Sequence, residues 1–249
     1  MALASKIWSS LLSATGMGAP SAKASFGGNA FDAGRYDVPQ MQSWTPGIDH
    51  PDEEITSSRD LVVARARDLS RNHPVIAGAI DRRTEAVVGP NLRLEAQPDF
   101  EAMGRSSDWG DEWATIAETQ FNVWSNDSRK LCDAARQSLF GGIVETAYRH
   151  WMVDGEACAN MLMIKRGGAY DTAVQLIDPD RLSNPYNAAE GSLYGASQNR
   201  LYSGVEVDKY GAAVAYHIRV RHPSDADISM DKFKWARIPR EGPTGRVMF

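Results

Sequence analysis

Apolar residues in the first half of the chain recur at steps of three and four residues, as they do along one face of a helix. One such stripe runs from Val62 to Val87 and is interrupted by Pro74. Proline removes a backbone donor and disfavours helical geometry in the residue before it, so the stripe predicts two helices, about 57–72 and 74–88. We expect its members to pack in the core: Val62, Ala66, Leu69, His73, Ile76, Ile80, Thr84 and Val87.

Two more helices are predicted further along the chain. Large apolar side chains at helical spacing indicate the first, and such an aromatic stripe is more typical of a core than of a cofactor site. The second spans about 134–153, with Asp133 as its capping residue and Gly155 as a left-handed residue at its end. The aromatic stripe consists of Trp109, Trp113, Ile116, Phe121 and Trp124.

The second half of the chain changes to short apolar runs bounded by glycine, proline, asparagine and aspartate, which are typical of strands. A strand is predicted already at 92–96, where apolar and polar residues alternate, and a hairpin is predicted to turn at 209–211. Because helices come first and strands follow without regular alternation, the predicted fold class is α+β with a mostly antiparallel β region. The other predicted strands are 156–165, 173–178, 204–208 and 213–220.

The N-terminal region has little periodicity. Residues 13–55 are rich in glycine, alanine, serine and proline, and only a short helical pattern precedes them at residues 3–11. A segment of this composition gains too little from burial to offset the ordering of its backbone. The sequence therefore predicts a flexible arm over residues 1–55 and one α+β domain over residues 56–249.

The amino-acid composition argues against several classes of function for this chain. The 249 residues carry 27 basic and 32 acidic side chains, a formal net charge of −5. This balance argues against a protein that coats nucleic acid, because such binding depends on an excess of lysine and arginine. The two cysteines, Cys132 and Cys158, lack the spacing of a zinc site or a disulfide framework. No run of about eighteen apolar residues is present, so no membrane partner is expected.

Motifs for catalysis or cofactor binding are missing from the sequence, which has no HExxH, phosphate-binding loop or GxSxG pattern. No catalytic residue, cofactor or metal is therefore expected. One alternative stays open, a Mg²⁺-dependent nuclease or phosphoesterase whose carboxylates at strand ends hold the ion. Its residues would be Asp154, Glu156, Asp178 and Asp180, although Asp-Pro-Asp is also a common turn composition.

Arginine is concentrated between Val63 and Ala96. Asp60, Asp68 and Glu85 lie within helical reach of these arginines, so we expect salt bridges along the helix surface. Paired arginines favour a subunit interface over contact with phosphates, although a small DNA-binding module formed by the helices over residues 65–83 is the alternative. The candidate interface or DNA-facing residues are Arg65, Arg67, Arg71, Arg82 and Arg83.

A series of motifs occurs in an order that carries a family resemblance. It begins with FDAGRYDVPQMQSW at Phe31 and ends with WARIPRE at Trp235. From Phe31 to the last residue, the chain resembles the lambda-type family of tailed-phage portal proteins. Between the two motifs lie RARDLSRNHPVIAGAIDRRTEAVVG, FNVWSND, MVDGEACANML, VQLIDPDRLSNP and GVEVDKYGAAVAYHIRVRHPSD, in the family's order.

The resemblance implies a structural subunit without a catalytic site. Portal proteins of this kind form rings, typically of twelve copies, at one vertex of the capsid, and double-stranded DNA is packaged and ejected through the ring. The implied partners are further copies of the chain, terminase, capsid and tail-adaptor proteins. The implied location is the virion, and the host cytoplasm during assembly.

Portal subunits of this family are considerably longer than this chain. We therefore expect an N-terminal portion, mainly the wing domain, truncated before the stem, clip and crown. Its end is expected to leave an exposed apolar edge at residues 247–249. Such a portion is not expected to close a conducting ring by itself.

Overall fold

The computed structural model describes residues 39–43, 47, 50–90, 92–226, 230–243 and 245–249. The chain divides into two units, residues 1–49 and 50–249. In the first unit, the described residues include one short helix, α2 (Pro39–Gln42). The helical pattern predicted at residues 3–11 and most of the predicted arm lie outside the described residues.

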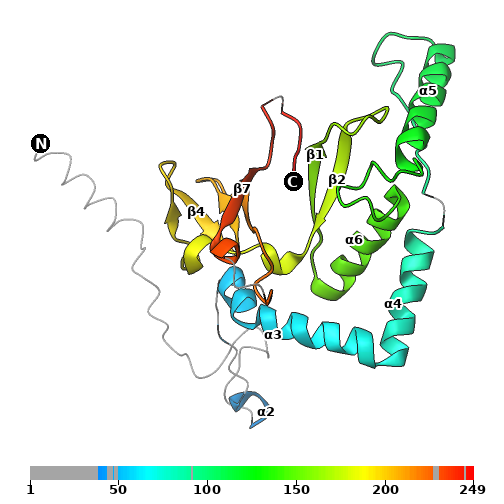
Figure 1. Cartoon of the computed structure of the whole chain (residues 1–249). Coiled ribbons are helices and arrows are strands. Elements are labelled where there is room, and N and C mark those ends of the chain that lie inside the picture. Colours follow the sequence, from blue (N-terminus) through cyan, green and yellow to red (C-terminus); the bar gives the residue numbers. More distant parts are fainter. Residues whose placement is uncertain (1–38, 44–46, 48–49, 91, 227–229, 244) are drawn as a thin grey trace, which may run out of the picture. The chain divides into compact units, whose positions relative to one another are not determined.

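The described part of the second unit begins with four helices (Figure 1), namely α3 (Pro51–Asn72), α4 (Pro74–Val87), α5 (Ser107–Ser125) and α6 (Phe140–Asp154). The predicted break is confirmed, because His73 is extended (φ −108°, ψ 105°) and Pro74 is the first residue of α4. The predicted start near Ser57 is wrong, since α3 already begins at Pro51. Proline is favoured at the first position of a helix, where its missing N–H would have no partner.

The ends of α5 and α6 show how local signals succeed or fail. Ser106 caps α5, and its side-chain oxygen accepts the N–H of Trp109 at 3.3 Å. The predicted start of the next helix near residue 134 is wrong, because α6 begins at Phe140. Gly155, with a φ of 84°, ends α6 in the left-handed conformation, as predicted. Asp133 organises a turn instead of capping a helix, as its carboxylate accepts the N–H groups of Ala135, Gln137 and Ser138.

Antiparallel strands follow the helices, which confirms the α+β class (Figure 1). β1 (Cys158–Met163) pairs with β2 (Thr172–Ile177), and five further strands form a meander in chain order. The segment predicted as a strand at 92–96 pairs with no strand among the described residues, and the N–H of Ala96 donates to Glu118 instead. An alternating pattern specifies two faces but supplies no partner strand. The meander consists of β3 (Leu193–Tyr194), β4 (Asn199–Tyr202), β5 (Val205–Val207), β6 (Ala213–Arg219) and β7 (Trp235–Pro239).

Two clusters of buried apolar side chains form part of the core of the described second unit. Phe121 and Trp124 pack against Phe140, with ring centroids 5.7 and 4.8 Å away, as predicted for part of the aromatic stripe. Trp113 and Ile116 of the same stripe are exposed, so their predicted place in the core is wrong. The clusters are Cys132, Ile143 and Val174, and Cys158, Ile177 and Ile218.

Much of the stripe predicted to fill the core along α3 and α4 lies outside it. Val62, Leu69 and Val87 expose 58%, 44% and 61% of their surface. Helix α3 instead turns Val63 and Arg67 toward the protein, and these residues are four apart and therefore on one side. A polar contact made by Arg67 thus helps to set the orientation, which an apolar pattern cannot reveal. No described helix is long and apolar enough to cross a membrane.

The last residues only partly form the exposed edge that was expected. Val247 exposes 52% of its surface, but Phe249 packs against Tyr216 with ring centroids 4.2 Å apart. The carbonyl of Met248 accepts the N–H of Met161 in β1 at 2.8 Å. The end of the chain therefore lies against β1 and contributes to the core beside it.

Candidate functional site

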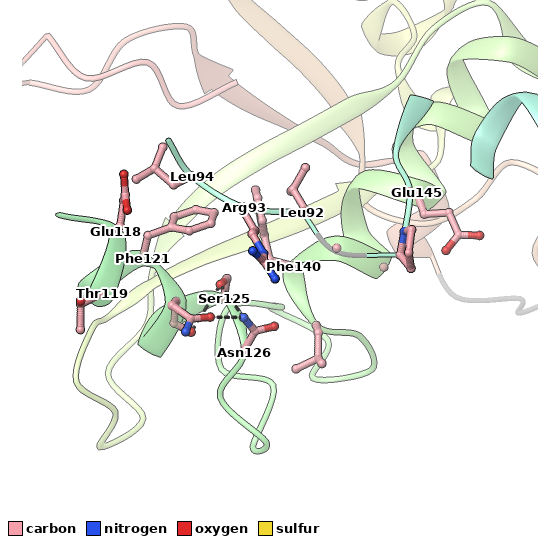
Figure 2. Close-up of a pocket in the computed structure, with 16 residues that line it drawn as sticks. Leu92, Arg93, Leu94, Glu118, Thr119, Phe121, Ser125, Asn126, Phe140 and Glu145 are labelled. Carbon is pink, nitrogen blue, oxygen red and sulfur yellow. Dashed lines mark hydrogen bonds between the residues drawn. The ribbon is translucent and has the colours of Figure 1, made fainter. Parts of the chain in front are cut away.

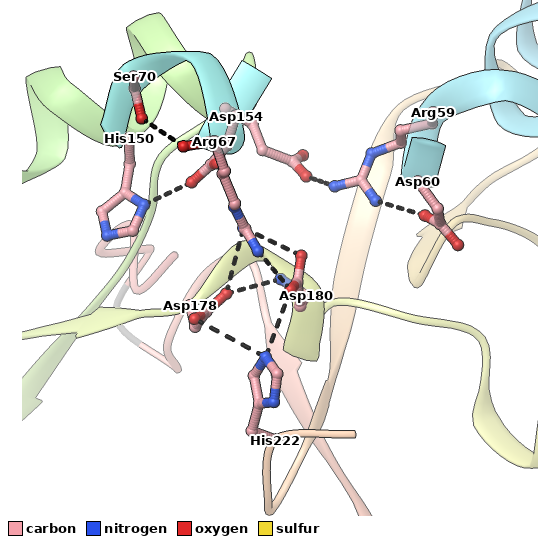
Figure 3. A network of polar contacts seen from close by, with 10 residues as sticks. Arg59, Asp60, Arg67, Ser70, His150, Asp154, Asp178, Asp180 and His222 are labelled. Atoms are coloured by element: carbon pink, nitrogen blue, oxygen red, sulfur yellow. Dashed lines mark hydrogen bonds and ion pairs between the residues drawn. The ribbon is translucent and has the colours of Figure 1, made fainter. Parts of the chain in front are cut away.

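Three of the four carboxylates considered for a metal site do meet in space, but they meet around an arginine (Figure 3). The Nε of Arg67 donates to Asp154 at 2.6 Å, and its Nη1 and Nη2 donate to Asp180 at 2.6 and 3.1 Å. Asp178 Oδ1 lies 3.7 Å from Arg67 Nη2. The Arg67 cluster comprises Arg67, Asp154, Asp178, Asp180, His150 and His222.

Local structure explains where the carboxylates of the Arg67 cluster lie. Asp154 is the last residue of α6, immediately before the left-handed Gly155. Asp178 begins the short 3₁₀ turn Pro179–Arg181 after β2, and its side chain accepts the N–H of Asp180 at 3.0 Å. The Asp-Pro-Asp sequence therefore does form a turn, and the turn also presents Asp180 to Arg67.

The Arg67 cluster lowers the pKa of two of its carboxyl groups, those of Asp154 and Asp180. Burial raises the pKa of Asp154, whose side chain is 3% exposed, but hydrogen bonds from Arg67 and His150 outweigh burial and hold that pKa below its usual value. Burial likewise raises the pKa of Asp180, and Arg67 and His222 bring it below its usual value. Hydrogen bonds to Asp154 and Asp180 raise the pKa of Arg67. One guanidinium thus ties α3 to the end of α6 and to the turn after β2.

Asp178, Asp180 and His222 place three donor atoms within 4.8 Å of one another, a spacing that a cation could bridge. The histidine argues against such a site. Its Nδ1 accepts the N–H of Ser224 at 3.1 Å, so the neutral ring carries its proton on Nε2, which faces Asp180 at 3.3 Å. A protonated nitrogen cannot bind a metal ion, and Arg67 already supplies positive charge to the carboxylates. The geometry therefore favours an ion-pair cluster over the Mg²⁺ enzyme alternative.

Glu156 does not join the Arg67 cluster and pairs with Arg59. Arg59 lies about two helical turns before Arg67 on α3, and it also approaches Asp60 at 3.6 Å. Helix α3 is therefore fastened to the residues around the end of α6 at two points. The four acids considered for catalysis are therefore partners of two arginines: Glu156 pairs with Arg59, and the other three surround Arg67.

The other predicted interface arginines are exposed and make no ion pair among the described residues. The prediction of salt bridges along the helix surface is wrong for these arginines. Asp68, for example, accepts a hydrogen bond from the amide of Asn72 at 2.6 Å instead. Asp81 pairs with Arg149 of α6 at 2.6 Å. An exposed ion pair contributes only about 0–1 kcal/mol to folding stability, because the two separate charges are nearly as well stabilised by water. The exposed arginines are Arg65, Arg71, Arg82 and Arg83.

A second polar cluster, which was not predicted, joins four strands of the meander. Glu206 on β5 accepts from Arg237 on β7 and from Asn199 on β4, each at 2.7 Å. His217 on β6 places its Nε2 3.3 Å from Glu206, and both residues are 1% exposed. Hydrogen bonds from Arg237 lower the pKa of Glu206 to about 2 against the effect of burial, whereas burial lowers the pKa of His217. The available signal was a charged residue in the middle of a strand-like run.

A cavity of about 610 Å³ lies beside the end of α5 and the start of α6 (Figure 2). Its walls include Leu92, Phe121 and Phe140, together with Asn122 and Asn126, whose amides bond to each other at 2.5 Å. The lining contains no histidine or cysteine and none of the predicted site residues. The candidate chemistry read from the sequence therefore does not gather in this cavity.

The chain is similar in sequence to portal proteins of phages. A family model described as phage portal protein, lambda family, matches residues 38–249. The portal protein of Escherichia phage N15 and portal protein B of Escherichia phage lambda are each 26% identical over 211 residues, which cover 84% of this chain and 38% of the relative. The probable portal protein of Halomonas phage phiHAP-1 is 24% identical over 201 residues, which cover 80% of this chain and 37% of that protein. The chain thus spans less than two fifths of the length of these relatives.

Proposed function

Because the chain belongs to the lambda family of phage portal proteins, we propose that it acts as a structural subunit at the portal vertex of a phage capsid. The match of the family model to residues 38–249 is the observation that carries the proposal. Portal proteins are structural rather than catalytic, in agreement with the expectation that this chain is not an enzyme. The ion pairs that occupy the four candidate acids support the same conclusion.

The proposed partners follow from the family. Further copies of the chain form a ring, typically of twelve subunits, and double-stranded DNA passes through it. Terminase, capsid and tail-adaptor proteins are the other proposed partners, at the virion's portal vertex and in the host cytoplasm during assembly. Within such a subunit, we assign residues 56–249 to the wing domain and residues 1–55 to an N-terminal arm, whose last residues, 51–55, begin helix α3.

The proposed arginine surface faces protein rather than DNA. Arg65, Arg71, Arg82 and Arg83 are exposed, whereas Arg67 is engaged inside the Arg67 cluster. A chain with a net charge of −5 lacks the basic excess that holds DNA non-specifically, which suits a conduit through which DNA must slide. The exposed arginines are therefore proposed as contacts to a neighbouring subunit.

Electron microscopy of the purified chain over a range of concentrations tests the proposal. The expected result is association of copies through one repeated contact, seen as arcs or short open chains of subunits. A particle that stays a monomer at every concentration would contradict the proposed role.

A nuclease assay with and without Mg²⁺ supplies an independent check. No cleavage is expected in either condition, because the carboxylates are engaged by Arg67 and Arg59. Mg²⁺-dependent cleavage that disappears on Asp178→Asn substitution would favour the enzyme alternative.

A further inference from the structure

Helix α5 carries an apolar stripe that the described part of the chain leaves uncovered. Trp113, Ile116 and Val123 expose 46%, 50% and 53% of their surface. They are three and seven residues apart, so they lie along one side of the helix. Phe121 and Trp124, which pack against Phe140, lie on the adjoining side, since Trp124 follows Trp113 by eleven residues, about three full turns. Helix α5 thus has one wide apolar side, of which one edge packs in the core and the other edge, at Ile116 and Val123, is exposed.

The charges of α5 all have the same sign. Residues 107–125 include four acidic side chains and no lysine or arginine. Glu112 precedes Trp113 and lies four residues before Ile116, so it stands beside the open stripe. It is exposed and makes no ion pair among the described residues. An acidic apolar helix face of this kind suits a partner that is apolar and basic.

Helix α3 offers an exposed apolar stripe with one basic side chain within it, flanked by the acids Glu54 and Asp68. Ile55, Val62 and Leu69 recur every seven residues and expose 62%, 58% and 44% of their surface. Leu61, 56% exposed, adjoins them. Arg65 stands three residues after Val62 and four before Leu69, in the middle of this stripe. It is exposed and also makes no ion pair among the described residues.

We propose that the α5 stripe of one copy packs against the α3 stripe of a neighbouring copy, with Glu112 facing Arg65. The inference rests on the proposed portal function, because it supplies the contact between adjacent subunits. Seven-residue apolar repeats are the pattern of helices that pack side by side over several turns. The opposite charges of Glu112 and Arg65 favour this pairing of the two surfaces.

The two stripes belong to different helices, and this matters for assembly. A contact between two unlike surfaces can repeat from copy to copy around a ring, whereas a contact between two identical surfaces stops at a dimer. Within one chain, α3 packs against α4 and α6, and its stripe stays open. The free surfaces therefore match the heterologous contact that a cyclic assembly requires.

Crosslinking between separately labelled copies tests the contact. One protein carries Arg65→Cys, a second of different mass carries Glu112→Cys, and the two are mixed and treated with a short bifunctional maleimide. A spacer is needed because a direct disulfide requires Cα atoms within about 7 Å. The natural Cys132 and Cys158 are buried and free, so their background reaction is expected to be low. Thermal unfolding confirms that both variants fold.

The expected product is the mixed dimer of the two variants, several-fold in excess over either homodimer. A matched control replaces Arg65→Cys with Tyr210→Cys, a residue of the β5–β6 turn that is 82% exposed and outside both stripes. This control is expected to give only background crosslinking.

The other outcomes separate the inference from the function on which it rests. If sedimentation shows association of copies but the mixed dimer does not exceed the control, the α3–α5 contact is wrong while the portal assignment stands. A predominance of Arg65→Cys homodimers would show that like surfaces meet, and would also overturn the contact. Absence of association at any concentration would overturn the proposed function and the contact together.

Discussion

Arg65 and Arg67 stand two residues apart on α3, yet their surroundings are opposite. Two residues along a helix differ by about 200° around its axis, so the two side chains lie on different faces. On the inner face, Arg67 is bonded to Asp154 and Asp180. On the outer face, Arg65 is exposed among open apolar side chains and makes no ion pair among the described residues.

The difference shows that one helix can carry two separate roles. The inner face contributes to the folded state, because removing Arg67 would leave the nearly buried carboxylate of Asp154 without its strongest partner. The outer face contributes little to folding, since an exposed charge is already well hydrated. Its exposed apolar stripe, with the exposed Arg65 among the apolar side chains, instead fits association with another copy.

The largest expected effect is on stability. Arg67→Met should lower the free energy of unfolding by about 2–3 kcal/mol, because it leaves a largely buried carboxylate with His150 as its remaining side-chain partner. Arg65→Met, the matched control on the outer face, should change it by no more than about 0.5 kcal/mol. Urea denaturation of both variants measures the difference. Equal losses would show that the two faces are not distinct.

The pH dependence of stability should sharpen the same distinction. The pKa values of Asp154 and Asp180 are lowered in the folded state, so their stabilisation is present above the unfolded pKa and is lost as pH falls through the folded pKa. Between about pH 6 and pH 3, the wild type should therefore lose stability mainly at the acid end. In Arg67→Met the loss of stability should begin at a higher pH, because the hydrogen bond from Arg67 no longer offsets the effect of burial on the pKa of Asp154.

Glu206 supplies the internal control for this titration. Its pKa of about 2 is set first by Arg237, and it lies in the meander rather than in the Arg67 cluster. Its contribution to acid unfolding should therefore be the same with and without Arg67. Identical pH profiles for wild type and Arg67→Met would contradict the proposed role of the Arg67 cluster.

A charge reversal on the outer face should act on association instead. Arg65→Glu is expected to weaken self-association by about tenfold, because it places like charges beside each other in the α3–α5 contact. The unfolding midpoint of the dissociated chain should stay unchanged. Analytical ultracentrifugation gives the association constant. A drop in folding stability without any change in association would show that Arg65 contributes to folding and not to the contact between copies.

The smallest effect is expected at the edge of the Arg67 cluster. His222→Ala should cost less than about 1 kcal/mol, because Asp180 keeps both bonds to Arg67. Divalent cations should not raise the melting temperature of either protein. Stabilisation by Zn²⁺ or Mn²⁺ that disappears in His222→Ala would restore the metal interpretation.

The parts of the fold that the sequence predicts depend on neighbours in the chain. Pro74 breaks the helix and Gly155 ends one, because each acts through its own backbone. The change from helical to strand periodicity likewise predicts the α+β class. The family resemblance depends on the order of motifs along the sequence, so it can be recognised without knowledge of any tertiary contact.

The parts that fail depend on partners far away in the sequence. Arg67 bonds to residues 87 and 113 positions further on, whereas a helical pattern considers only residues three or four apart. The alternating segment at 92–96 likewise lacks a partner strand among the described residues. Three of the four candidate acids do come together around Arg67, whereas Glu156 pairs with Arg59, and neither arginine could be assigned from spacing.

Sedimentation velocity of two charge-reversed proteins, alone and mixed, tests the contact between the two faces most directly. Arg65→Glu and Glu112→Arg should each associate weakly alone, because each pairs a reversed surface with an unchanged one. An equal mixture can alternate the two proteins so that every α3–α5 contact again joins opposite charges, and it should recover association close to that of the wild type. A mixture that associates no better than its components would contradict the assignment of the outer face of α3 to a neighbouring subunit.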